Sequence, residues 1–359
     1  MARPALGAAL LATLLVGVTA CSRGATQEPA SAPVTITPRL LFADHSEGTT
    51  SFWLASPSEP ADRTQLVRVS HDPEWGVRAS LSPDGRSLAY TWMPPGARDP
   101  DGEAVLTVLD LADRSSRRIA TRLDLRTTPV WLGSTGSIVV QRRGPSGAGT
   151  LVQIDGDGRE RILLNAAPGR RLFPAAASPD GSRIYVADSN GSETRLRVLD
   201  TQAGERDLGV IAEGTARGYT LAADGNTLAF LRFTGADRRY RAFVIDLNSG
   251  AVTPLRPDQE RLEDTGIVWA GDGFAVTSVT STGGGLLLGP LPGRDQARAN
   301  GFDAAAAAPP GGGWLAVRSF QDGDPGAPGP ETLQIVDGAG RRVTVTGEGG
   351  VSAIGWTGT

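Results

Sequence analysis

The stretch LSPDGRSLAY at residues 81–90 places two apolar segments on either side of an Asp-Gly pair. The same arrangement recurs as ASPDGSRIYV at residues 177–186 and as AADGNTLAF at residues 222–230. Asp-Gly between apolar runs is a strong hairpin signal, because glycine adopts a positive φ at no steric cost and aspartate bonds its own backbone. Each copy therefore predicts a strand, a tight turn and a second strand.

Four weaker copies become visible once these three are aligned. They are LGSTGSIVV (132–140), AGDGFAV (270–276), PPGGGWLAV (309–317) and IGWTG (354–358). The turn glycines recur every 39 to 51 residues, the length of a four-stranded propeller blade. They are Gly85, Gly136, Gly181, Gly225, Gly273, Gly312 and Gly358. The count predicts seven blades.

In most of the repeats a third strand ends in an aspartate and leads through a short turn into a fourth, more polar strand. The copies are VLTVLD, LVQID, LRVLD, AFVID and LQIVD, ending at Asp110, Asp155, Asp200, Asp246 and Asp337. The predicted unit is strand a, Asp-Gly turn, strand b, long loop, strand c, Asp turn, strand d. The 47 glycines and 25 prolines, with only 6% aromatics, suit many short strands better than long helices.

The two ends of the repeat region complete each other. Residues 38–55 resemble strands b and c without a preceding a, whereas residues 351–359 resemble an a strand without the rest. Pairing them would leave no open sheet edge. The sequence thus predicts an all-β fold: a seven-bladed β-propeller of four-stranded antiparallel blades over residues 38–359, closed within one blade by the N- and C-terminal segments.

These repeats resemble the WD40-like PD40 repeat of TolB-type propellers. Its signature runs Ser-Pro-Asp-Gly, two residues, then an aliphatic, a small and an aromatic residue, and residues 82–85 and 178–181 match it closely. The resemblance covers residues 38–359 and implies a propeller. The same repeat precedes the hydrolase domain of prolyl-oligopeptidase-like enzymes, and no such domain is expected here.

Residues 1–20 read as an export signal. Arg3 precedes an apolar stretch, Ala5–Val18, that is too short for an ordinary membrane span. The segment ends Val-Thr-Ala-Cys at Cys21, which resembles the lipobox of bacterial lipoproteins and implies that this cysteine is diacylated and becomes the first residue. Residues 21–37 are rich in Ala, Ser, Thr and Pro and predict a flexible tether. We expect an extracytoplasmic protein anchored by lipid to the cell membrane.

Catalytic and cofactor signatures are scarce. The only histidines, His45 and His71, fall in predicted loops, and Cys21 is the only cysteine, so neither a three-histidine metal site nor a thiolate cluster is expected. No Gly-x-Ser-x-Gly elbow or Walker loop occurs, and no cofactor is expected. The net charge of −4 argues against a nucleic-acid partner. A glycosidase that uses a pair of carboxylates remains an alternative, although the sequence does not indicate which two acidic residues would form the pair.

Long b–c loops on one face of the propeller predict the binding surface, since binding residues concentrate on loops held by a rigid scaffold. These loops are Met93–Ala104, Arg232–Arg241 and Phe320–Glu331. At the entries to strand a, around the mouth of the central channel, arginines in three blades face acids in two others. They are Arg126, Arg171 and Arg217, and Glu263, Asp264 and Asp303. This arrangement would hold an anionic or zwitterionic ligand, or else the charges would pair with one another along the rim.

The function predicted from these observations is a monomeric, non-enzymatic binding or scaffold module for a protein partner or small ligand. An enzyme at the channel mouth, of the lyase or glycosidase class, is one alternative. An accessory sensor lipoprotein of an envelope signalling system is the other.

Overall fold

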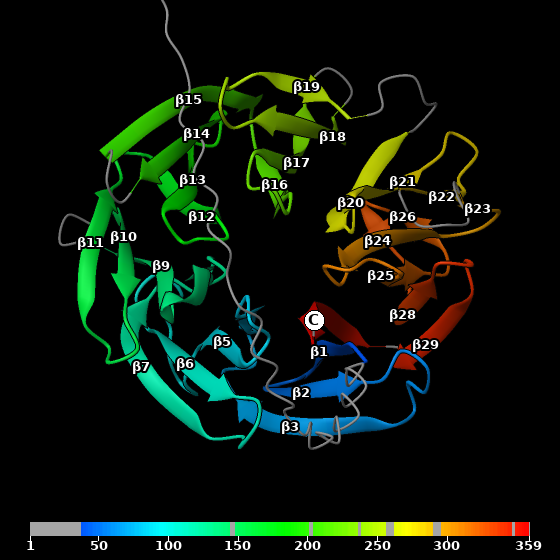
Figure 1. Ribbon diagram of the computed structural model, residues 1–359, viewed down its shortest axis with the longest axis horizontal. Coiled ribbons are helices and arrows are strands. Elements are labelled where there is room, and N and C mark those ends of the chain that lie inside the picture. Colours follow the sequence, from blue (N-terminus) through cyan, green and yellow to red (C-terminus); the bar gives the residue numbers. More distant parts are fainter. Residues whose placement is uncertain are drawn as a thin grey trace, which may run out of the picture. The chain divides into compact units, whose positions relative to one another are not determined.

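The strands form blades arranged around a common axis (Figure 1). The structure, a computed structural model, describes residues 37–143, 148–200, 204–235, 238–255, 262–289, 296–346 and 349–358. Within these residues seven four-stranded antiparallel sheets are present, and a two-stranded hairpin accompanies the last of them. Residues 36–359 make up one unit. The predicted seven-bladed, all-β architecture is confirmed.

Each blade is one sheet whose strands succeed one another from the axis outward. From its inner to its outer edge, blade 1 contains β30 (Gly350–Thr357), β1 (Arg39–Ser46), β2 (Thr49–Ala55) and β3 (Arg63–Ser70). Blade 2 contains β4 (Arg78–Leu81), β5 (Ser87–Trp92), β6 (Ala104–Asp110) and β7 (Ser116–Leu123). Blade 3 contains β8 (Val130–Leu132), β9 (Ser137–Arg143), β10 (Gly149–Ile154) and β11 (Glu160–Asn165), with the 3-10 turn η1 (Gly133–Thr135) after β8.

The remaining blades follow the same pattern. Blade 4 contains β12 (Arg171–Ala177), β13 (Arg183–Ser189), β14 (Glu193–Asp200) and β15 (Gly204–Glu213), and blade 5 contains β16 (Ala216–Leu221), β17 (Thr227–Thr234), β18 (Arg239–Asp246) and β19 (Val252–Pro254). Blade 6 contains β20 (Glu263–Ala270), β21 (Gly273–Val279), β22 (Gly285–Leu288) and β23 (Gln296–Arg298). Blade 7 contains β24 (Phe302–Ala307), β25 (Trp314–Phe320), β28 (Glu331–Asp337) and β29 (Arg342–Thr346), and the hairpin of β26 (Gly323–Asp324) and β27 (Ala327–Pro328) lies between β25 and β28 in sequence.

The Ser-Pro-Asp-Gly turns are held by hydrogen bonds from their own side chains. In blade 4 the Ser178 hydroxyl donates to the Asp180 carboxylate over 2.5 Å and accepts the amide of Arg183 over 2.9 Å. Gly181 has a φ of +72°, and a Cβ added there would lie 3.1 Å from the backbone carbonyl carbon of Leu132 in blade 3. Glycine is therefore required both by the turn and by the neighbouring blade.

The turn of blade 6 differs from its prediction. Gly273 is the first residue of β21, paired with Ala270, and the residue at positive φ is Gly271, at +78°. The sequence GDG offers two glycines, and the two-residue hairpin uses the first. The other six predicted turn glycines all have positive φ.

The ring closes through the chain ends, as predicted. β1 pairs antiparallel with β30 from Arg39 opposite Thr357 to His45 opposite Gly350, so residues from both ends share blade 1. In Figure 1 the red strand carrying the C-terminus lies beside the blue β1. The inner strand of this blade is thus supplied by the last residues of the chain.

The apolar core is divided into layers between neighbouring blades. One layer joins Leu106 of blade 2 to Ile138 and Val152 of blade 3, all fully buried. Another joins Phe42 of blade 1 to Leu333 of blade 7 across the closure. Each blade is therefore stabilised by its neighbours, which is how repeat folds bury faces that a single repeat cannot.

The predicted signal peptide, Cys21 and the tether as far as Ile36 lie outside the described residues. Within the described residues, no helix has the length and hydrophobicity needed to cross a membrane.

Candidate binding site at the inner ends of blades 1 to 4

The b–c loops and d–a connections lie on the same face because strands alternate in direction within each blade. Two of the three predicted loops are more regular than expected. β17 and β18 extend into the stretch 232–241 and leave only residues 235–238 between them, and residues 320–331 contain the β26–β27 hairpin. Residues 93–103 connect β5 to β6 without a strand, as expected.

A cavity of about 430 Å³, which we call the arginine cavity, opens on this face between blades 2, 3 and 4. It is lined by Asp101, Asp124, Gln141, Arg143, Ala148, Gly149, Pro168, Gly169, Arg170 and Arg171. Asp101, from the loop between β5 and β6, is the acidic residue that three arginines contact. Its carboxylate lies 3.0 Å from Arg126, 3.0 Å from Arg143 and 3.7 Å from Arg171.

The three arginines arrive from different elements. Arg126 lies in the connection from blade 2 to blade 3, Arg143 ends β9 and Arg171 begins β12. Their side chains remain 40 to 48% exposed. Arg143 also donates to both carboxylate oxygens of Asp99, over 2.8 and 3.2 Å. A guanidinium carries five N–H donors, so these ion pairs leave further donors on the three side chains.

The floor of the arginine cavity is polar and buried. The Asp124 carboxylate accepts the amide of Arg126 over 2.8 Å and the side-chain amide of Gln141 over 3.1 Å. Burial raises the pKa of the Asp124 carboxyl, with the nearby Asp101 acting in the same direction. These contacts fix the backbone that carries Arg126.

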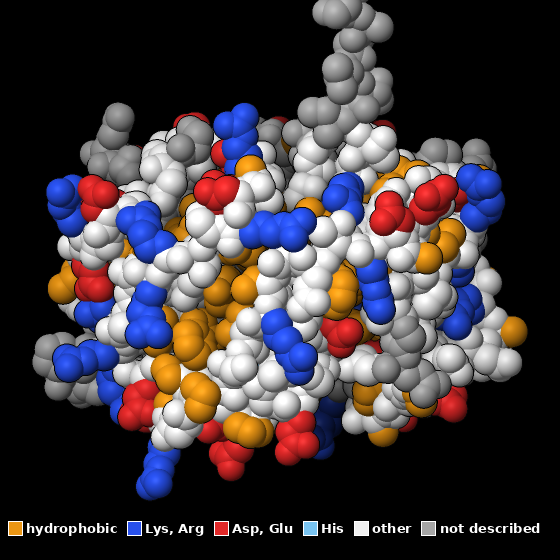
Figure 2. Space-filling view, turned by 90° about the horizontal axis from the view of Figure 1, so that it is seen from below, with side chains coloured by type: hydrophobic (Ala, Val, Ile, Leu, Met, Phe, Trp, Pro, Cys, Tyr) orange, Lys and Arg blue, Asp and Glu red, His pale blue; other side chains and the backbone are white. Residues whose placement is uncertain are grey.

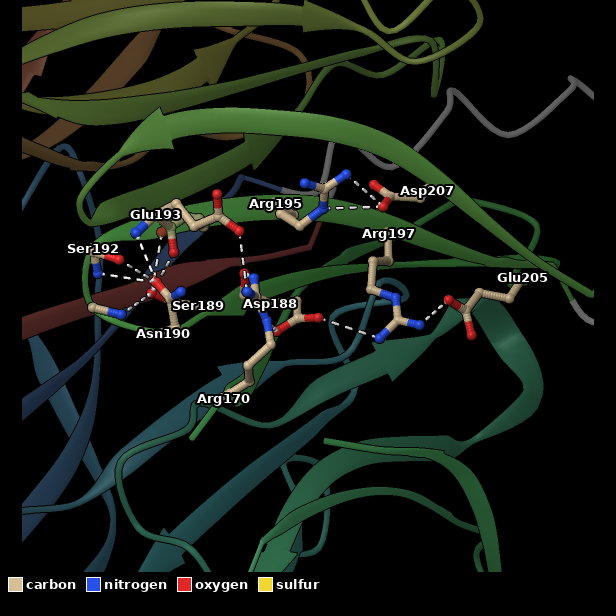
Figure 3. A network of polar contacts seen from close by, with 12 residues as sticks. Arg170, Asp188, Ser189, Asn190, Ser192, Glu193, Arg195, Arg197, Glu205 and Asp207 are labelled. Carbon is tan, nitrogen blue, oxygen red and sulfur yellow. Dashed lines mark hydrogen bonds and ion pairs between the residues drawn. The ribbon is translucent and has the colours of Figure 1, made fainter. Parts of the chain in front are cut away.

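Arg170, also in the lining, is engaged by its own blade. Its guanidinium lies 2.5 Å from Asp188 and 3.1 Å from Glu193 (Figure 3). Asp188 in turn lies 3.2 Å from Arg197, which pairs with Glu205 across the outer strands. Arg170 therefore supports the wall of the cavity, and Arg143 and Arg171 are the more exposed arginines of its lining.

The other predicted site residues lie elsewhere on the rim. Arg217 stacks over the ring of Tyr240 at 3.7 Å. Asp264 is fully buried and accepts the amide of Ala242 and the hydroxyl of Ser278, while Glu263 precedes it at the start of β20. Asp303 lies 2.7 Å from both Arg298 and Arg342. The structure thus brings Arg126 and Arg171 together on Asp101 and gives Arg217, Asp264 and Asp303 local partners in blades 5 to 7.

A second cavity of about 430 Å³, the histidine cavity, lies against the inner strands of blades 1 and 2. Its lining includes His45, Trp75, Arg78, Arg126, Arg318, Glu331 and Ser352. Arg126 also borders the arginine cavity through Asp101, and Arg318 donates to Glu331 over 2.7 Å. Within the part of the chain that the structure describes, Arg78 makes no ion pair.

The prediction that both histidines lie in loops is wrong for His45. His45 lies in β1, and its two ring nitrogens are each 3.0 Å from a hydroxyl oxygen, of Thr50 and of Ser352. His71 follows β3 and is buried, with its Nε2 3.0 Å from the same Thr50 hydroxyl. Burial lowers the pKa of His45 below its ordinary value, and the neighbouring His71 lowers it further.

Two solved structures similar to this chain are a TolB protein and a prolyl oligopeptidase. TolB from Acinetobacter baumannii superposes with a TM-score of 0.56 at 14% identity, covering 90% of this chain and 68% of that one. The chain has the propeller fold of TolB. Prolyl oligopeptidase B from Galerina marginata superposes with a TM-score of 0.57 at 13% identity, and this chain covers 52% of its length. No family model and no curated protein matches the sequence.

The TolB-like propeller carries site residues that sequence reasoning missed. Asp101 lies inside a loop predicted to bind, but no sequence signal shows that arginines from two other blades converge on it. Ser352 and His45 are 307 positions apart and meet only because the ring closes. Among the described residues, no group of three or more His, Cys, Asp or Glu side chains is placed to hold a metal ion.

Proposed function

We propose that this protein is a membrane-anchored, extracytoplasmic binding module whose arginine cavity receives an acidic group of a protein partner or small ligand. The convergence of Arg126, Arg143 and Arg171 on the single carboxylate of Asp101 carries the proposal. Guanidinium groups bind carboxylate and phosphate through paired N–H donors. The ion pairs of Asp101 support the proposal, because they place a carboxylate among these guanidinium groups.

In this proposal, the Asp101 carboxylate already contacts the guanidinium groups that would bind the acidic group of a ligand. The Asp101 side chain is 22% exposed and holds the three guanidinium groups apart and oriented, so a ligand meets a preorganised set of donors. The cost is competition, because Asp101 shares the donors with the incoming anion. Binding is therefore expected to be of moderate strength and sensitive to salt.

The side of the propeller seen in Figure 2 supports binding of anions at one site rather than over the whole surface. Arginines and acidic side chains are interspersed there, with no broad patch of one sign. Selectivity for an acidic ligand would then come from the cavity, where arginines from separate blades meet. The acyl chains on Cys21 would hold the propeller near the membrane surface.

The test uses the full-length lipidated protein in detergent and a hexaglutamate peptide as probe. Reversing two arginines that line the cavity, Arg143→Glu with Arg171→Glu, should weaken binding by about tenfold or more, measured by titration calorimetry. The matched control is Arg86→Glu with Arg159→Glu, two exposed arginines on the a–b and c–d turns of the opposite face. Equal losses in both pairs, or no binding by the wild type, would rule out the cavity as the site.

A further inference from the structure

The two histidines of this chain belong to one line of hydrogen bonds that runs across β30, β1 and β2 of blade 1 to His71, the residue after β3. Ser352 on β30 bonds His45 Nε2 on β1, and His45 Nδ1 bonds Thr50 on β2, each over 3.0 Å. Thr50 bonds His71 Nε2 over 3.0 Å, and His71 Nδ1 lies 2.8 Å from the backbone carbonyl of Asp72. The line therefore starts at an exposed serine and ends at a carbonyl.

That carbonyl fixes the direction of every bond in the line. A carbonyl oxygen only accepts, so His71 Nδ1 must carry the proton, and neutral His71 accepts at Nε2. The Thr50 hydroxyl then donates to His71, and its oxygen accepts from His45 Nδ1–H. Neutral His45 is left with a lone pair on Nε2, which accepts the hydroxyl proton of Ser352.

The surroundings keep His45 neutral at physiological pH. Burial lowers its pKa most, His71 and Arg78 also lower it, and Asp44 and Glu331 raise it by less, so that the net direction is downward. Thr50, which orients the ring, is fully buried, and His71 is 5% exposed. The base is thus unprotonated, and its donor side is held by groups that water does not reach.

Ser352 is an exposed residue that lines two cavities. One is the histidine cavity and the other is a smaller cavity of about 150 Å³, and both are also lined by His45 and Arg78. The cationic side chain of Arg78 therefore belongs to the lining of both cavities that Ser352 borders. Positive charge at this place stabilises negative charge that develops on a substrate oxygen.

We propose that Ser352 is a nucleophile, with His45 as its general base, for acyl transfer from small carboxylic esters. The serine oxygen would attack the ester carbonyl carbon while its proton moves to His45 Nε2. Collapse of the tetrahedral intermediate breaks the bond to the alcohol, which leaves with that proton. Water, deprotonated by His45, then releases the carboxylic acid and restores the serine. Thr50 and His71 act as positioning residues, because they touch the ring and not the substrate.

This activity is separate from binding in the arginine cavity. It uses β30, β1 and β4, whereas Arg143 and Arg171, the two residues reversed to test anion binding, line the arginine cavity and not the histidine cavity. Loss of hexaglutamate binding in the arginine variants would leave ester hydrolysis intact, and failure of the esterase proposal would leave the binding proposal standing.

The experiment follows p-nitrophenyl acetate hydrolysis and labelling by a fluorophosphonate, with the modified residue located by mass spectrometry. Wild-type protein should be labelled at Ser352, and Ser352→Ala should abolish both signals. His45→Gln should lower the rate about 100-fold, the usual contribution of a general base. The matched control Ser46→Ala removes a hydroxyl of β1 that bonds Thr49 and no histidine, and it should retain the wild-type rate.

The pH profile tests the orientation of the line. For the wild type, the rate should rise with pH to a plateau, with its midpoint below the ordinary histidine pKa of 6.5. Thr50→Val keeps the shape of the side chain but removes the link to His71, so it should lower the plateau and move the midpoint. Thermal melts of each variant separate loss of activity from loss of fold. Hydrolysis by Ser352→Ala at the wild-type rate, or a fluorophosphonate adduct at another residue only, would overturn the proposal.

Discussion

At the scale of single residues, Asp101 controls the proposed binding site. Replacing its carboxylate by an amide of the same size, Asp101→Asn, removes the internal competitor and leaves Arg126, Arg143 and Arg171 in place. We expect hexaglutamate to bind severalfold more tightly to this variant, because a like-charged neighbour of the ligand is gone. Asp157→Asn, on the exposed turn before β11, makes the same chemical change far from the cavity and serves as the control in calorimetry.

A weaker affinity for Asp101→Asn would indicate that the carboxylate orients the arginines more than it competes with a ligand. No change would place the ligand elsewhere. The sign of the effect therefore distinguishes a ligand site from a purely structural ion-pair cluster.

His45 gives the free energy of unfolding a dependence on pH. Its pKa in the folded protein is lowered, so the unfolded chain binds a proton more readily. Stability is then complete above the unfolded pKa of about 6.5 and is lost as the pH falls toward the lower folded value. Urea midpoints of the wild type should drop between pH 7.5 and 5.5 by more than those of His45→Gln. Parallel pH curves for the two proteins would contradict the assignment.

The conformation of individual residues was predicted correctly where their contacts lie within a few positions along the chain. The Ser-Pro-Asp-Gly turns depend on contacts within five positions, as the bonds of Ser178 to Asp180 and Arg183 show. The histidine line was missed because its contacts join residues that only ring closure brings together. Gly273 was misplaced because two adjacent glycines fit the same turn and local sequence does not choose between them.

At the scale of elements, β30 is the strand on which ring closure depends. Deleting Val351–Thr359 removes most of this inner strand and leaves the edge of β1 unpaired. It also removes Trp356, which is buried in the layer between blades 1 and 7. We expect a large fall in the melting temperature, whereas removing nine residues from the tether, 22–30, should change it little. Similar melting temperatures for the two truncations would contradict a ring that closes in blade 1.

Element boundaries were predicted well where periodicity was strong and poorly in long connections. Four of the five predicted third strands end at their aspartates, as β6 does at Asp110, where the aspartate side chain caps the following turn. The fifth, β10, ends at Ile154, one residue before Asp155. The connections at residues 232–241 and 320–331 contain more strand than expected. Their pairing continues hairpins begun by neighbouring strands, a tertiary effect that composition does not reveal.

At the scale of the whole molecule, the lipid anchor is a prediction from residues 1–21. Cys21→Ala should prevent acylation, so the protein should no longer partition with detergent in Triton X-114 phase separation. Mass spectrometry of the wild-type protein from its host should show acyl chains on Cys21, with Cys21 as the first residue. A mature protein without acyl mass would contradict the anchor and leave the propeller unaffected.

The central claim is that the protein binds through the face formed by the b–c loops and d–a connections. The most direct test introduces the photo-crosslinker p-benzoylphenylalanine into the lipidated protein in living host cells. In one variant it replaces Pro95, an exposed residue of the β5–β6 loop that carries Asp101. In the other it replaces Ala223, an exposed residue of the a–b turn of blade 5. The account predicts a crosslinked adduct from Pro95 that disappears when Arg143 and Arg171 are reversed to glutamate, and none from Ala223. An adduct from Ala223 alone would place the binding surface on the opposite face and contradict the account.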